Sequence, residues 1–353
     1  MRALDLSQDV VSLTQALVGI ESVSGNEQAI ADAVEHALRD LPHLYVERDG
    51  DTVMARTDLG RAERVVLAGH LDTVPVNDNF PGRLEGERLV GLGACDMKGG
   101  CAVILRTAAA LAEPNRDITF FLYECEEVEA ERNGLKRLST THPEWFKADF
   151  AVLMEPTSAA VEGGCQGTVR VDVVARGMRA HSARSWMGDN AIHKAADILQ
   201  RLRDYEPRQP HVDGLTYHEG LNAVAISGGV AGNVIPDEVR VSVNYRYAPD
   251  RADAEAVSFL REFFDGYDVE VSDLAPGARP GLDRDVAAAF VEAIGGEPRP
   301  KLGWTDVARF TELGVPAVNY GPGSPMMAHK QDEYVETAEL RECEQRVLAW
   351  LSR

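Results

Sequence analysis

Cysteine is scarce in this chain and follows none of the patterns that signal a structural use. The 353 residues include five cysteines, an odd number, and no C-x-x-C pair. Neither a disulfide framework nor a thiolate zinc site is therefore indicated. Most of these residues should be small buried hydrophobes, although Cys95 and Cys125 stand beside acidic residues of interest and a ligand role for either stays open.

Positive charge and long apolar runs are also in short supply. Lysine and arginine number 36 against 57 aspartates and glutamates, which gives a net charge of −21. Such a charge disfavours phosphate backbones and anionic lipid surfaces, so neither nucleic acid nor a membrane is an expected partner. The first 20 residues have charges within their apolar stretch and no small-residue cleavage pattern, and no segment reaches the roughly 18 apolar residues that a membrane-spanning helix needs. A cytoplasmic protein is therefore expected. A small acidic substrate fits this charge only where a few arginines gather locally.

The chain has enough length and apolar content for two hydrophobic cores. At 353 residues it exceeds a comfortable single core, and 44% of its residues are hydrophobic. Its first part alternates continuous apolar strands, such as 64–70, with helical patterns, such as 99–113. This alternation is typical of an α/β domain with a mostly parallel sheet. The stretch from Ser24 onward predicts a further helix, with Ser24 or Asn26 as its N-terminal cap.

The middle of the chain has a different pattern. From Thr168 onward, strands of strictly alternating polarity such as "TVRVDVVARG" and "EVRVSVNYRY" occur in the order β-α-β-β-α-β. This order predicts a ferredoxin-like α+β domain, inserted at residues 167–276 into a catalytic domain that comprises residues 1–166 and 277–353. The edge of such a sheet is a template for pairing with its own copy, so the inserted domain is expected to build a homodimer.

Histidine and acidic residues follow the strands of the first domain, where an open α/β sheet binds its ligands. They are His70, Asp72, Asp96, Glu126, Glu127, Glu155 and His329. Carboxylates gathered in this way repel one another, and Lys98 is the one cation nearby in the sequence, so a divalent metal is the economical counter-charge. Imidazole with carboxylate suits zinc, and the number of donors fits two ions that share a carboxylate.

Two pairs within this set suggest a division of roles. Of the adjacent glutamates Glu126 and Glu127, one can ligate a metal while its neighbour handles the proton of a water molecule. Asp72 lies two residues beyond His70 and is placed to hold the second imidazole nitrogen. The pattern therefore predicts a catalytic metal centre.

Six motifs in fixed order resemble those of a known family. They are "GHLDTVP", "GLGACDMKGG", "ECEE", "MEPT", "RAHSA" and "GPGSPMMAHKQDE". Over nearly its whole length the sequence is similar to the co-catalytic di-zinc aminoacylase/carboxypeptidase family of metallopeptidases, which includes an inserted dimerisation domain. The resemblance implies an amide hydrolase with two Zn²⁺ per subunit, for which Co²⁺ may substitute.

The resemblance also implies a role for each residue of the metal centre. His70 and Glu155 would bind one zinc, Glu127 and His329 the other, and Asp96 would bridge them. Glu126 would be the general base and Asp72 would orient His70. A cis peptide bond is expected between Asp96 and Met97. His181, which on its own reads as a surface residue, matches a histidine that reaches the partner subunit's active site and polarises the scissile carbonyl.

Substrate preference depends on two further segments. Asn233 and Arg246 in one, and Thr305 and Arg309 in the other, resemble residues with which some family members bind the carboxylates of a succinylated diamino acid. Guanidinium groups are the expected receptors of a small acidic N-acyl amino acid. The alternative that either arginine pairs with a structural aspartate stays open.

Two other functions remain possible from the sequence alone. One is a deacetylase, aminoacylase or dipeptidase activity within the same family. The other is a non-catalytic metal-binding scaffold on the same fold, against which the intact Glu126 speaks, because a pure binding site needs no base beside its ligands.

Overall fold

The computed structural model describes residues 4–352, which divide into two compact units. Unit 1 comprises the residues up to 163 together with 280–299 and those from 306 onward, and unit 2 comprises residues 164–279 and 300–305. The chain therefore leaves unit 1, builds unit 2 and returns. In the described part of the chain, no helix combines the length and the apolar character that crossing a membrane requires.

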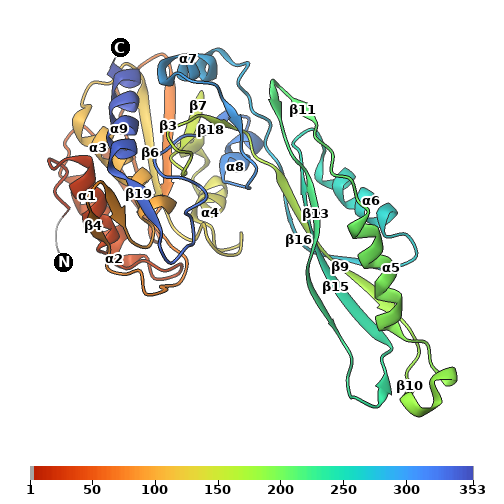
Figure 1. The fold of residues 1–353 in the computed structure, drawn as a ribbon. Helices are drawn as coiled ribbons and strands as arrows, with labels where there is room; N and C mark the ends of the chain where they lie inside the picture. Colours follow the sequence, from red (N-terminus) through yellow and green to blue (C-terminus); the bar gives the residue numbers. More distant parts are fainter. Residues whose placement is uncertain (1–3, 353) are drawn as a thin grey trace. The chain divides into compact units, whose positions relative to one another are not determined.

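Unit 1 is an α/β structure whose elements alternate along the chain (Figure 1). Its strands are β1 (Tyr45–Asp49), β2 (Thr52–Arg56), β3 (Arg64–His70), β4 (Arg83–Glu85), β5 (Arg88–Val90), β6 (Asp117–Tyr123), β7 (Phe150–Leu153), β8 (Glu162–Gly163), β17 (Arg299–Pro300), β18 (Ala317–Asn319) and β19 (Tyr334–Glu336). Its helices are α1 (Val10–Val18), α2 (Gln28–Arg39), η1 (Ala94–Lys98), α3 (Gly99–Ala110), α4 (Gly134–Thr141), η2 (Pro143–Phe146), α7 (Asp285–Ile294), α8 (Val307–Glu312) and α9 (Thr337–Ser352).

The main sheet of unit 1 has the strand order β1-β2-β6-β3-β7-β18-β8-β17. The four central strands β6, β3, β7 and β18 run parallel, whereas β1, β2 and β8 pair antiparallel at the flanks. Every residue of β6 and β7 is buried, as expected for strands that are covered on both faces. The predicted mostly parallel α/β sheet is confirmed.

Aromatic clusters mark the two buried faces of this sheet. Phe121 of β6 packs on Phe146 and Phe310, from η2 and α8, with ring centroids 4.9 and 6.3 Å away. A second cluster joins Phe150 of β7 to Phe290 of α7 at 5.4 Å and adds the Trp350 ring of α9. Each face therefore has its own covering layer, and the ends of the strands are left to form a site.

Helix α2 begins differently from the prediction. Its N-terminal cap position is Glu27, and no side chain makes a capping hydrogen bond there. The Ser24 hydroxyl donates instead to the Asp72 carboxylate at 2.7 Å. The expectation that Ser24 or Asn26 caps this helix is therefore wrong, because the polar side chains of this segment are used in the tertiary structure.

Unit 2 contains a four-stranded antiparallel sheet in the order β13-β15-β9-β16, with two helices packed on it (Figure 1). Its elements are β9 (Gly167–Arg176), β10 (Ala180–His181), η3 (Ser182–Met187), α5 (Ala191–Arg203), β11 (His211–Val212), β12 (Leu215–Thr216), β13 (Gly220–Gly228), β14 (Val234–Ile235), β15 (Glu238–Tyr247), α6 (Asp253–Phe263) and β16 (Asp268–Ala275). The chain order β9-α5-β13-β15-α6-β16 is the predicted ferredoxin-like order.

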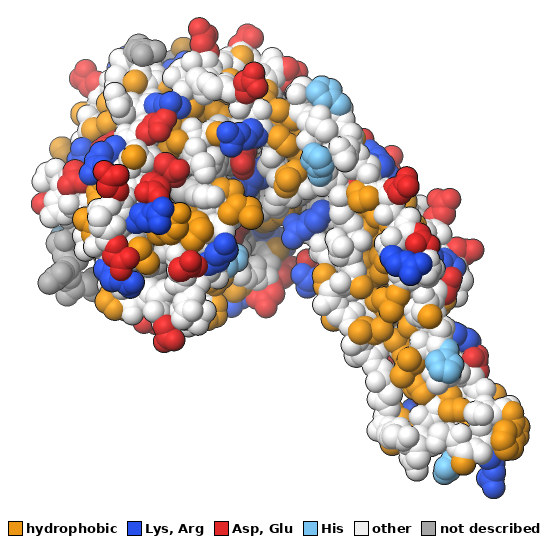
Figure 2. Space-filling model, in the orientation of Figure 1, with side chains coloured by type: hydrophobic (Ala, Val, Ile, Leu, Met, Phe, Trp, Pro, Cys, Tyr) orange, Lys and Arg blue, Asp and Glu red, His pale blue; other side chains and the backbone are white. Residues whose placement is uncertain are grey.

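Most of the outer strand β13 of unit 2 is exposed to solvent. Its residues 222–228 are all exposed, and Val224 and Ile226 are 59% and 55% exposed. Other large apolar side chains of unit 2, Met178, Trp186 and Met187, are also exposed. On the face drawn in Figure 2, apolar side chains extend along unit 2, whereas acidic and basic side chains are interspersed over unit 1. Unit 2 therefore presents an uncovered strand edge with apolar side chains.

Candidate metal centre

The parallel strands of unit 1 place the sequence-predicted residues at one edge of the sheet. His70 is the last residue of β3, Glu126 and Glu127 follow β6 after Tyr123, and Glu155 follows β7 after Leu153. Because β3 is in parallel register with both β6 and β7, these segments leave the sheet at the same end.

Asp96 lies between two imidazoles. Its Oδ1 is 3.1 Å from His70 Nε2, and its Oδ2 is 3.6 Å from His329 Nε2. The second imidazole also lies 2.9 Å from Glu127 Oε1. One ligand atom from each of His70, Asp96 and Glu127 lies within 4.8 Å of the others. A carboxylate that offers one oxygen to each of two histidines has the arrangement of a bridging ligand.

The segment that carries Asp96 has an unusual backbone. The Asp96–Met97 peptide bond is cis, as the family resemblance implied. Asp96 lies in η1, which continues directly into α3, and residues 99–105 of that helix are buried.

Asp72 contacts more groups than the predicted one. The Nδ1 atom of His70 lies 3.0 Å from the backbone carbonyl of Asp72 and 3.5 Å from its carboxylate. The same carboxylate accepts hydrogen bonds from the N–H groups of Glu126 at 3.0 Å and Glu127 at 3.1 Å. Asp72 therefore fixes the imidazole and the two-glutamate turn together.

The electrostatics of the centre reflect excess negative charge. Burial alone would lower the pKa of His70, but the carboxylates of Asp72, Asp96 and Glu155 raise it well above its usual value. The hydrogen bond to Glu127 raises the pKa of His329 to about 9. Burial, together with the charges of Glu155 and Glu127, raises the pKa of Glu126 well above its usual value.

The donor set fits divalent zinc. It contains two imidazoles and several carboxylates, and no thiol ligand is required. The ammonium group of Lys98 donates to the Ile20 carbonyl at 2.7 Å, and burial lowers the pKa of Lys98 to about 8. Because the Lys98 ammonium group binds a backbone oxygen and not these carboxylates, we expect a bound cation to compensate their charge.

Two of the predicted residues lie together in unit 2. His181 ends β10 and pairs in register with Val234, the residue after Asn233. The Asn233 carbonyl accepts the N–H of Ser182 at 2.9 Å. His181 is exposed, and its Nδ1 accepts the N–H of Ala183 at 3.0 Å, so a neutral ring carries its proton on Nε2. This tautomer offers an N–H donor to an incoming carbonyl oxygen.

Arg246 belongs to the opposite end of the same unit. It lies one residue before the end of β15, whereas Asn233 precedes the start of that strand. The eight residue-to-residue steps from Glu238 to Arg246 span about 26 Å of extended chain, at roughly 3.3 Å per step. Among the described residues, no hydrogen bond or ion pair of the Arg246 guanidinium is found. Arg246 and the pair His181 and Asn233 therefore lie at opposite ends of unit 2.

The two remaining candidates have structural partners. Thr305 is buried, and its backbone carbonyl accepts from Cys165 Sγ at 3.7 Å. The Arg309 guanidinium forms an ion pair with the fully buried Asp306. For Arg309, the structural pairing that the sequence left open is therefore present.

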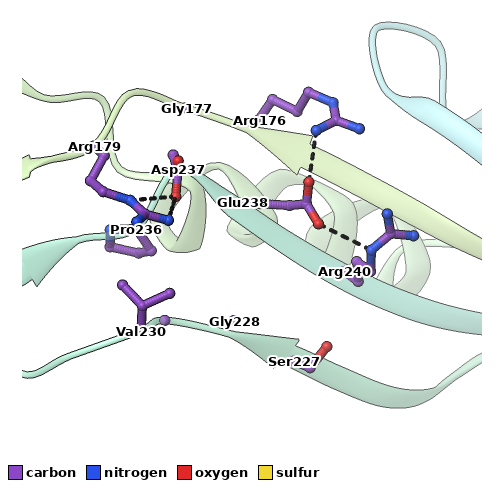
Figure 3. Close-up of a pocket in the computed structure, with 11 residues that line it drawn as sticks. Arg176, Gly177, Arg179, Ser227, Gly228, Val230, Pro236, Asp237, Glu238 and Arg240 are labelled. Carbon is purple, nitrogen blue, oxygen red and sulfur yellow. Dashed lines mark hydrogen bonds and ion pairs between the residues drawn. The ribbon is translucent and has the colours of Figure 1, made fainter.

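A cavity of about 530 Å³ in unit 2 is lined by three arginines, each of which forms an ion pair with a carboxylate (Figure 3). Arg176 and Arg240 both contact Glu238, at 2.7 and 3.1 Å, and Arg179 contacts Asp237 at 2.8 Å. This local concentration of arginine offers no free guanidinium for an acidic substrate, and none of the metal-centre residues lines it.

Sequence reasoning missed two buried glutamates beside the centre. Glu333 is 1% exposed, and its Oε1 accepts the N–H groups of Cys95 at 2.9 Å and Asp96 at 3.0 Å. Burial raises the pKa of Glu333 to about 7. The second is Glu27, also 1% exposed. Glu333 ends one of the six motifs and Glu27 lies outside them all, and an acidic residue at either position is equally typical of a helix start or a solvated loop.

Comparison with known proteins gives one family and close relatives. Residues 66–353 match the profile of the family described as peptidase family M20/M25/M40. A Mycobacterium tuberculosis H37Rv protein with the provisional name succinyl-diaminopimelate desuccinylase DapE is 54% identical over 335 residues, which cover 94% of this chain and 95% of that protein. The Corynebacterium glutamicum succinyl-diaminopimelate desuccinylase is 49% identical over 94% of this chain and 92% of its own length.

A solved structure has the same fold at lower identity. The aminopeptidase PepT from Bacillus cereus superposes with a TM-score of 0.80 at 20% identity, over 99% of this chain and 98% of that one. At this identity the likeness concerns the fold alone.

Proposed function

The chain belongs to peptidase family M20/M25/M40, and from this premise we propose that it is a succinyl-diaminopimelate desuccinylase of lysine and diaminopimelate biosynthesis. The reaction is hydrolysis of N-succinyl-LL-2,6-diaminopimelate to LL-2,6-diaminopimelate and succinate. Support comes from the two relatives of 54% and 49% identity that carry this name and match almost the whole chain. The single observation that carries a hydrolytic metal centre is Asp96, whose two oxygens face two imidazoles.

We propose two divalent ions per subunit, with zinc as the expected metal and Co²⁺ as a substitute. His70 and Glu155 would hold one ion, Glu127 and His329 the other, and Asp96 would bridge them. Both histidines and both oxygens of Asp96 fit this assignment by position. When bound, such ions polarise a carbonyl group and lower the pKa of a water molecule towards about 7.

The protein groups divide the proton transfers among themselves. Glu126 takes a proton from water, and the oxygen adds to the succinyl carbonyl carbon. The C–N bond then breaks, and Glu126 gives its proton to the leaving amine. Asp72 holds the N–H groups of Glu126 and Glu127 while this happens. His181 donates its Nε2–H to the developing oxyanion.

The separation within unit 2 supports a site built from two chains. His181 and Asn233 lie at one end of β15 and Arg246 at the other, about 26 Å away by strand length. Succinyl-diaminopimelate is too short to contact both ends of one rigid strand of this length. We therefore propose a homodimer through residues 167–276, in which His181 and Asn233 serve the partner's site. The exposed edge of β13 is a suitable place for the two copies to pair.

The substrate contributes three carboxylates, which require cationic or hydrogen-bonding receptors. Arg246 is the strongest candidate because its guanidinium has no partner among the described residues. Asn233, Thr305 and Arg309 are proposed as further contacts, with Asp306 fixing the Arg309 side chain. All five cysteines are buried. The scarcity of cysteine suits a reducing compartment, and the proposed location is the cytoplasm.

A hydrolysis panel tests this assignment. Zinc-loaded protein is assayed with succinyl-diaminopimelate, acetylornithine and simple dipeptides, and the highest kcat/KM is expected for the first. Glu126→Ala should abolish turnover, whereas Glu129→Ala, which alters an exposed neighbour, should not. Preference for acetylornithine or a dipeptide would favour the alternative deacetylase, aminoacylase or dipeptidase activity. Full zinc binding without hydrolysis of any of these substrates would favour the non-catalytic scaffold.

A further inference from the structure

The turn that carries the two catalytic glutamates has an unfavourable backbone conformation at its first residue. Cys125 follows β6 and has a φ of 56°, in the left-handed region that glycine adopts freely and other residues rarely do. Glu126 and Glu127 come next, so the direction of both side chains depends on this residue. Something outside the turn must favour the left-handed conformation.

The Glu27 side chain supplies a contact at that position. It is 1% exposed, and its Oε1 accepts the backbone N–H of Cys125 at 3.1 Å and the Cys125 thiol at 3.3 Å. As the residue before α2, Glu27 could have capped its own helix, but no capping hydrogen bond is made there. Its carboxylate is directed across 98 residues of sequence to the turn.

Two buried carboxylates thus hold three successive amides. Glu27 accepts from the N–H of Cys125, and Asp72 accepts from those of Glu126 and Glu127. The segment 24–27 contains one of these acceptors, Glu27, and contacts the other, because the Ser24 hydroxyl donates to the Asp72 carboxylate at 2.7 Å. One anchor binds the strained residue itself, and the other binds the two residues that follow it.

We propose that Glu27 is a positioning residue: by binding the Cys125 amide it holds the left-handed turn that aims Glu126 at the substrate and Glu127 at a metal ion. The role of Glu27 rests on the proposed function of those two residues. Glu27 itself touches neither substrate nor metal. Loss of its acceptor should let Cys125 relax towards a common conformation and swing both glutamates away.

The side-chain oxygen of Glu27, rather than its negative charge, should be what holds the turn. Glu27→Gln keeps a side-chain oxygen that can accept the Cys125 N–H, whereas Glu27→Ala keeps none. Glycine at position 125 adopts a positive φ without steric cost, so Cys125→Gly should make the turn less dependent on Glu27. A merely structural role of Glu27 at the start of α2 would not respond to a change at residue 125.

The experiment compares Glu27→Ala, Glu27→Gln, Cys125→Gly and the double variant Glu27→Ala/Cys125→Gly, with Gln28→Ala as a matched control at the exposed neighbouring position. Zinc affinity is measured by titrating apoprotein, and kcat and KM are measured with succinyl-diaminopimelate. Glu27→Ala should lower kcat and the affinity for the more weakly held zinc by about 10- to 100-fold with KM little changed. Glu27→Gln and the control should stay within about threefold of wild type.

The double variant decides the matter. Its zinc affinity and its kcat should each be about fivefold or more higher than those of Glu27→Ala. No rescue, or a Glu27→Gln protein as impaired as Glu27→Ala, would overturn the proposal, as would normal zinc affinity and kcat in Glu27→Ala. If wild-type protein does not hydrolyse the substrate, the proposed function fails, and the zinc titrations still test Glu27. Circular dichroism and thermal unfolding verify that each variant is folded.

Discussion

Mixing two inactive variants tests whether the catalytic site is assembled from two chains. His181→Ala removes the unit 2 imidazole and leaves the metal centre intact, whereas Glu126→Ala removes the proton acceptor and leaves unit 2 intact. Loss of the His181 donor should lower kcat by about 10²- to 10³-fold. Each homodimer lacks one required group at both of its sites. A heterodimer has one site with both groups and one with neither, provided that His181 serves the neighbouring chain.

The expected gain follows from this arrangement. With equal amounts and free exchange, about half of the dimers are heterodimers and one of their two sites is complete, so the mixture should reach about a quarter of wild-type turnover. The structural ground is β15, whose paired length separates His181 and Asn233 from Arg246 by about 26 Å. If His181 acted within its own chain, every site would lack one group and the mixture would match its inactive parents.

The assay follows succinate release over time after mixing differently tagged chains. Co-purification through both tags measures how much heterodimer has formed. Complete exchange with no regained hydrolysis would refute the role of His181 in the partner's site. A monomer that is fully active at the assay concentration would refute the need for a dimer.

Three further predictions concern the metal centre and the sheet. Metal analysis after reconstitution should give two zinc ions per chain, and Asp96→Ala should weaken both; a plateau of one ion in fully active protein contradicts the bridge. Glu126→Ala should lose at least about 10²-fold in kcat while keeping its zinc, whereas His70→Ala and His329→Ala should bind zinc more weakly; a zinc-free Glu126→Ala protein would reverse that assignment. Asp117→Asn should lower the free energy of unfolding by about 1–3 kcal/mol, because the buried carboxylate accepts two backbone N–H groups and a hydroxyl. Burial would raise the pKa of Asp117, but these hydrogen bonds lower it below 3.8. The stabilisation by the Asp117 carboxylate should therefore be complete above that pH and be lost in more acidic solution. Urea titrations of both proteins at several pH values measure this difference in the free energy of unfolding, and an equal pH dependence of the two proteins would refute the reasoning.

The sequence was sufficient to predict which side chains meet at one edge of the main sheet; that they hold metal stays a prediction. In a parallel sheet, the residue type that follows each apolar strand is a local observation, and the shared edge turns several local observations into one site. His70, Glu126 and Glu155 follow three such strands, which are in parallel register. The alternating pattern of residues 167–276 likewise contained enough information for the order of strands and helices in unit 2.

The residues that hold the centre in place could not be predicted in this way. Ser24 and Glu27 form a pattern that is normal for the start of a helix, and only the folded chain shows that they contact the Asp72 carboxylate and the Cys125 amide. Glu333 is equally ambiguous, because an acidic residue before a short strand is usually solvated. Long-range contacts of this kind leave no periodic signal in one sequence.

The crowding of carboxylates between His70 and His329 has a consequence for the amount of protein in a cell. Burying these charges close together opposes folding, and a bound cation offsets that cost, so metal stabilises the native chain by mass action. A ligand present at 100 times its dissociation constant adds about 2.7 kcal/mol to the free energy of unfolding. When the divalent metal is scarce, a larger fraction of chains should therefore unfold and become accessible to proteases. We therefore expect the supply of metal to set the lifetime of this protein as well as its turnover.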